Sequence, residues 1–100
     1  MKNKVISKVE LRKKALADFF KCNESEISVV KGEYCTYTYK DVHYQLSTRK
    51  ECKFYHGIDP DDYSVQDKVK EQYLGVAHGL LHGQVFGYYV SIVKLTAGDN

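Results

Sequence analysis

The fold is decided by residues 34–46, which read YCTYTYKDVHYQL. Aromatic residues and threonines alternate at every second position in the first half of this stretch, which is the period of a β-strand. Lys40-Asp41 interrupts the alternation, which then resumes through Leu46. The pattern predicts two antiparallel strands joined by a tight turn. The β-branched run over 27–31 adds a third strand, so we predict a three-stranded antiparallel meander.

A helix is predicted on the N-terminal side of this meander. Ser7 followed three residues later by Glu10 forms the capping-box pattern that starts helices. We expect the helix to end near Cys22, before a turn-rich segment. Its apolar positions share one stripe, which should pack on the sheet. They are Leu11, Ala15, Leu16, Phe19 and Phe20.

Two further helices are predicted after the meander. Thr48 and Glu51 repeat the capping-box pattern and open a short helix. Asp59-Pro60 predicts the start of a longer helix, since aspartate is a good N-cap and proline suits the first helical position. We expect this helix to run to about His82.

The last part of the chain is open to two interpretations. Residues 85–95 are rich in β-branched and aromatic residues on both faces, which favours a buried C-terminal strand. The alternative makes residues 60–95 largely helical, because glycines recur every four residues there and would align on one helix face. Residues 73–93 contain no Asp, Glu, Lys or Arg, but their histidines and glycines disfavour a membrane span. We therefore expect no membrane association.

Length and composition predict one α+β domain over residues 1–100. The chain is 43% hydrophobic and contains thirteen aromatic residues, which is enough to build a core. Its three cysteines are odd in number and widely spaced, so we expect reduced thiols in a cytoplasmic protein. No metal or cofactor is predicted. A zinc site at His78 and His82 lacks a third ligand.

Catalysis is not expected, so we predict that the protein is not an enzyme. Cysteine and histidine together can form a nucleophile pair, but nothing nearby in the sequence activates a thiol. The pairings considered are Cys35 or Cys52 with His43 or His56.

Nine tyrosines are the most unusual feature of the composition. Each hydroxyl requires water or a hydrogen-bond partner, so the tyrosines cannot all lie at the centre of a core. Tyrosines displayed on a sheet suit a protein partner, because they supply large rigid contact areas. We therefore predict a protein-interaction module that binds a host protein or nucleoprotein. The expected contact residues are Tyr37, Tyr39 and Tyr44, with Arg12 and Lys13 at the rim.

Two other interpretations stay open at this point. Residues 1–56 carry twelve Lys and Arg against seven Asp and Glu, so a basic helix with nearby tyrosines can also suit nucleic acid. An apolar final strand or a row of glycines can also meet its own copy in a symmetric homodimer.

The first half of the chain resembles small accessory proteins of phages and other mobile elements, anti-CRISPR proteins among them. The resemblance lies in Ala15–Phe20, in the acidic turn Asn23–Ile27, and in Tyr44–Glu51, where a strand passes into a capped helix. It implies a protein that inhibits or regulates host machinery by occupying a surface. The chain departs from the DNA-mimicking members, because its composition is not strongly acidic.

Overall fold

A computed structural model describes residues 7–32 and 35–93. The helical elements are α1 (Lys8–Phe20), η1 (Glu24–Glu26), α2 (Arg49–Glu51), η2 (Cys52–His56), η3 (Tyr63–Val65) and α3 (Gln66–Gln72). The strands are β1 (Ser28–Val29), β2 (Thr36–Tyr39), β3 (Val42–Ser47), β4 (Gly75–Leu81) and β5 (Gln84–Ile92). Helices and an antiparallel sheet confirm the predicted α+β class. No helix among the described residues is long and apolar enough to cross a membrane.

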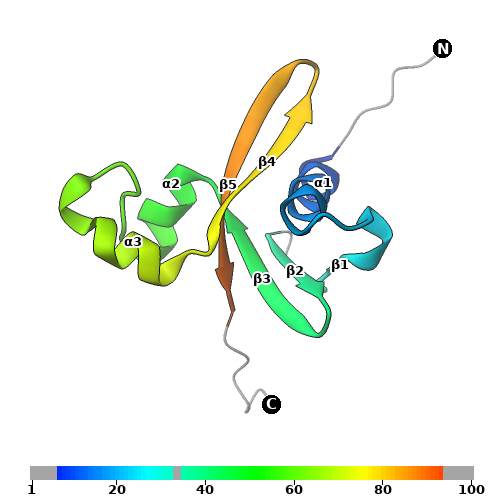
Figure 1. Cartoon of the computed structure of the whole chain (residues 1–100), viewed down its shortest axis with the longest axis horizontal. Coiled ribbons are helices and arrows are strands. Elements are labelled where there is room, and N and C mark those ends of the chain that lie inside the picture. The colour runs from blue at the N-terminus through cyan, green and yellow to red at the C-terminus, as the bar shows by residue number, and fades with distance from the viewer. Residues whose placement is uncertain (1–6, 33–34, 94–100) are drawn as a thin grey trace.

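The five strands form one antiparallel sheet in the order β1-β2-β3-β5-β4. The first three strands are the predicted meander; Tyr34, which was expected to begin its second strand, lies outside the described residues. In Figure 1, α1 lies on one side of the β4–β5 hairpin, and α2 and α3 lie on the other. The base of the hairpin therefore lies between two helical parts of the molecule, and its turn end projects beyond α2 and α3.

The start of α1 follows the sequence prediction. The Ser7 hydroxyl caps the helix by accepting a hydrogen bond from the Glu10 amide at 3.0 Å. Lys21, at a φ of 55°, ends the helix just before the expected position. The predicted stripe packs on the sheet, with Leu16 fully buried in the core. Other core residues are Ala15, Ala17, Ile27, Tyr37, Leu46, Ala77, Tyr88 and Val90.

The short helix after the meander also forms where it is expected. The Thr48 hydroxyl accepts from the Glu51 amide at 3.2 Å, and the Thr48 amide donates to the Glu51 carboxylate at 2.9 Å. This capping box opens α2, which continues into the π-helical turn η2. Gly57, with a φ of 67°, terminates η2 as predicted.

The prediction of a helix from Asp59-Pro60 to His82 is wrong in its extent, and so is the alternative of a largely helical 60–95. Residues 75–81 form β4, and α3 covers only Gln66–Gln72. The predicted start is also wrong, because the first helical turn after Gly57 is η3, which Asp62 caps in place of Asp59. A four-residue glycine spacing aligns the glycines on one face of a helix, but it also aligns them on one face of a strand, because four is a multiple of two. The predicted C-terminal strand is present as β5, and Leu95 lies outside the described residues.

Candidate functional site: the β4–β5 hairpin

Tyr37, the first of the predicted contact residues, lies in the core. Its side chain is fully buried, and its hydroxyl donates to the Val9 carbonyl at 3.3 Å. Burial raises the pKa of Tyr37 well above its ordinary value near 10. The expectation that this ring is displayed outward is wrong, because the strand register places it on the face of the sheet that packs against α1.

Tyr39 and Tyr44 are half-buried against the end of α1. The Tyr39 ring stacks on Phe20 with centroids 4.7 Å apart and planes at 20°. The Tyr44 ring lies 4.9 Å from the same phenylalanine. The two rings are therefore engaged within the molecule, and only part of each is left for a partner.

Arg12 is buried and is held by three elements. Its guanidinium donates to the Leu46 carbonyl at 2.7 Å and to both carboxylate oxygens of Glu51 at 3.2 and 3.3 Å. It also lies 4.7 Å from the centroid of the Tyr88 ring. Arg12 thus joins α1 to the sheet and to α2, while Lys13 is half-buried on the same helix. Two of the predicted contact residues, Tyr37 and Arg12, are thus buried within the fold.

Among the described residues, neither Cys35 nor Cys52 forms a hydrogen bond with His43 or His56 that would activate its thiol. Cys52 is buried, and this burial raises the pKa of its thiol, which keeps the thiol protonated. His43 is engaged across the sheet, with its Nδ1 2.6 Å from the Thr38 hydroxyl. The Cys35 sulfur accepts from the Gln45 amide at 3.7 Å.

His78 and His82 do not share a helix face. His78 lies on β4, and His82 lies in the turn that follows. Over residues 7–32 and 35–93, no three His, Cys, Asp or Glu side chains gather where they could hold a metal ion.

The β4–β5 hairpin carries an exposed aliphatic surface that sequence reasoning missed. On β4, the small residues Ala77 and Gly79 are buried toward α1. A Cβ atom at Gly79 would lie 2.9 Å from Leu11 Cδ1 and 3.2 Å from the Leu11 carbonyl oxygen, so the helix backbone approaches the strand closely. The side chains of Val76, His78 and Leu80 alternate with these positions and point away from α1.

We call the outward set the hairpin patch; it consists of Val76, His78, Leu80 and Val85. Leu80 is 64% exposed, and Val85, which pairs with it across the hairpin, is 65% exposed. Paired residues in an antiparallel ladder share a face, so these side chains form one continuous surface. The alternation of small and large residues over 75–80 is the sequence signal that could have located it.

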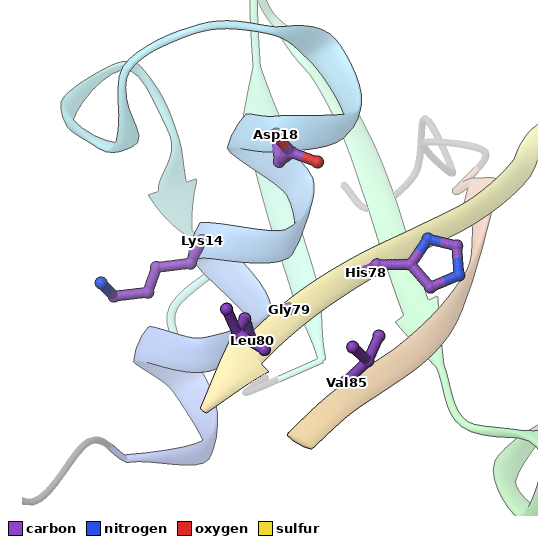
Figure 2. A pocket seen from close by; sticks show the side chains of 6 residues that line it. All are labelled: Lys14, Asp18, His78, Gly79, Leu80 and Val85. Atoms are coloured by element: carbon purple, nitrogen blue, oxygen red, sulfur yellow. The ribbon is translucent and has the colours of Figure 1, made fainter. Parts of the chain in front are cut away.

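A cavity of about 470 Å³ lies where the hairpin patch meets α1. Figure 2 shows Lys14 and Asp18 on successive turns of α1, with His78, Leu80 and Val85 on the adjoining hairpin. The patch is therefore bordered on the helix side by one positive and one negative side chain. This arrangement of an apolar centre and a charged border is the general anatomy of protein-binding surfaces.

Comparison with protein-family models, with curated proteins and with solved structures finds no match to the chain. The resemblance of the first half to phage and mobile-element accessory proteins stays a prediction.

Proposed function

We propose that the chain is a non-enzymatic interaction module that binds a partner protein through the hairpin patch. The observation that carries the proposal is the outward display of Val76, Leu80 and Val85 on a hairpin whose other face is occupied by α1. A continuous group of exposed aliphatic side chains marks an interaction surface more often than scattered ones do.

Rigidity supports the same proposal. The hairpin closes through the two residues His82 and Gly83, whose positive φ angles of 51° and 79° match a type I′ turn. Seven cross-strand pairs connect β4 and β5. Because the patch stands on paired strands, binding would require little additional ordering of the backbone, and this lowers the entropic cost of association.

Capture of a partner from lysate of the source organism by the full chain tests the proposal. The test variant is Leu80→Ser with Val85→Ser, and the matched control is Val29→Ser with Ile92→Ser, which removes two exposed aliphatic side chains elsewhere on the sheet. We expect the test variant to lose at least tenfold in affinity, because truncating two central apolar contacts costs about 1 kcal/mol or more each. The control should bind as the parent does.

Other outcomes would contradict the proposal. An equal loss of partner affinity in the test and control variants would show that any exposed apolar side chain contributes to binding, and not the hairpin patch in particular. Retained binding in the test variant would exclude the hairpin patch.

Sedimentation of the isolated chain is measured first, since an apolar sheet face can also pair with a copy of itself. Binding to oligonucleotides that weakens steeply with salt would favour the nucleic-acid alternative instead.

A further inference from the structure

A second cavity lies on the α1-facing side of the same hairpin and has a different chemistry. It measures about 490 Å³, which is within the roughly 300–1,000 Å³ typical of small-molecule sites. Its lining comes from α1, from the α2 capping box and from the hairpin. The hairpin patch does not contribute to it, so the two surfaces can be tested separately.

Apolar side chains form the inner part of this cavity. Leu11 and Tyr88 are both 5% exposed, and Phe86 and Leu81 extend the apolar wall toward the opening. Phe86 is 36% exposed, so part of its ring is accessible from the solvent. An apolar ligand group seated here would be removed from water, which is favourable in proportion to the area covered.

Charge in the cavity is unbalanced toward positive. Arg12 and Glu51 both line it, but they pair with each other through two hydrogen bonds and so largely cancel. Lys8 and Lys50 also line it, and both are exposed. Two ammonium groups therefore stand at the outer part of a cavity whose inner wall consists of apolar side chains and the neutralised Arg12–Glu51 pair.

We infer that this cavity binds a small organic carboxylate with an apolar body. The apolar body would lie against Leu11, Phe86 and Tyr88, and the carboxylate would lie between Lys8 and Lys50. The hydroxyls of Ser7 and Thr48 line the same cavity, but each already accepts a hydrogen bond from a helix amide. The lysines are thus the groups that select for negative charge.

Titration of the full chain with octanoate and with the neutral octanamide tests this inference in two-dimensional amide NMR spectra. We expect octanoate to shift the amide signals of Leu11, Phe86 and Tyr88, with a dissociation constant below the millimolar range. Octanamide should bind at least fivefold more weakly, since it has the same apolar body and lacks the charge.

Variants separate the specific site from general electrostatic attraction. Lys8→Gln with Lys50→Gln should weaken octanoate binding about tenfold and leave octanamide binding unchanged. The charge-matched control, Lys21→Gln with Lys68→Gln, alters two exposed lysines outside the cavity and should have no effect. Leu80→Ser with Val85→Ser should also bind octanoate normally, whatever it does to a protein partner.

Three results would overturn the inference: equal affinity for octanoate and octanamide, equal weakening in the two lysine variants, or no response at Leu11 and Tyr88. A peptide with a free C-terminal leucine is the comparison ligand. Binding of that peptide without binding of octanoate would assign the cavity to a chain terminus and would exclude the small-molecule ligand.

Discussion

The β2–β3 and β4–β5 hairpins share a turn design but differ in which side chains they bury. Each closes through two residues of positive φ, Lys40-Asp41 in the first and His82-Gly83 in the second. On β2, the large ring of Tyr37 faces α1 and is fully buried. On β4, the small residues Ala77 and Gly79 face α1, and the aliphatic side chains of Val76 and Leu80 face solvent.

The difference shows that the size of the covered side chains determines how closely α1 approaches each hairpin. Both hairpins contain apolar residues, so their apolar content does not distinguish them. Where the inward positions are tyrosines, the helix is held off by rings, as Phe20 against Tyr39 shows. Where the inward position is Gly79, the helix backbone comes into contact with the strand. The following predictions test this distinction.

The largest effect on stability is expected at alkaline pH, where the buried tyrosines make the free energy of unfolding depend on pH. Burial raises the pKa of Tyr37, Tyr73 and Tyr88 in the folded protein, and burial also raises that of Cys52. Above about pH 9 for the thiol and pH 10 for the tyrosines, the unfolded chain loses protons that the folded chain retains. The contribution of these four groups to the free energy of unfolding should therefore be constant below this range and fall as pH rises through it.

Urea denaturation followed by circular dichroism at stepped pH measures this dependence. Tyr37→Phe should make the decline shallower, because it removes one buried group that resists ionisation. Tyr63→Phe is the matched control, since Tyr63 is 91% exposed, and its slope should equal that of the parent. A decline that Tyr37→Phe leaves unchanged would show that Tyr37 does not contribute to it.

A smaller effect on stability is expected when a side chain is added at Gly79, where α1 and β4 are in close contact. Gly79→Ala would place a Cβ 2.9 Å from Leu11 Cδ1, and the nearby backbone carbonyl cannot move aside easily. We expect a loss of about 1–3 kcal/mol in the free energy of unfolding, as for other overpacked sites. Gly87→Ala is the control on β5, where the closest atom is Val76 Cγ1 at 3.4 Å. It should change stability by less than about 0.5 kcal/mol. Equal losses would refute the close approach.

The smallest effect concerns the two turns. Asp41 has a φ of 64°, a conformation that glycine adopts without strain. Asp41→Gly should therefore stabilise the protein by about 0.5–1 kcal/mol and make the first turn resemble the second. The reverse change, Gly83→Asp, should destabilise the protein by a similar amount, since Gly83 has a φ of 79°. Thermal denaturation of both variants measures the pair, and effects of the same sign would contradict the shared turn design.

Much of the fold could be predicted because its signals are local. The Ser7 and Thr48 caps, the two-residue periodicity around Lys40-Asp41 and the terminating Gly57 each depend on residues within a few positions of one another. The extent of α3 could not be predicted in this way. A glycine every fourth residue fits a helix or a strand, and the approach of α1, which is distant in sequence, decides between them.

The candidate site was less predictable for the same reason. Tyrosine content indicates rings that need partners, but it does not show whether those partners are water, a carbonyl such as that of Val9, or another ring. Arg12 illustrates the point most clearly. In the sequence it belongs to a basic helix, whereas in the structure it is buried against Glu51 and the Leu46 carbonyl.

The contact between Gly79 and α1 divides β4 into two sets of positions under different selection. Inward positions are constrained by the helix and tolerate little change in volume. Outward positions 76, 78 and 80 touch no part of that contact, so they can exchange one side chain for another while the fold is maintained. Related sequences should therefore conserve the inner row of this strand and diversify the outer row, which would let one scaffold acquire new binding specificities.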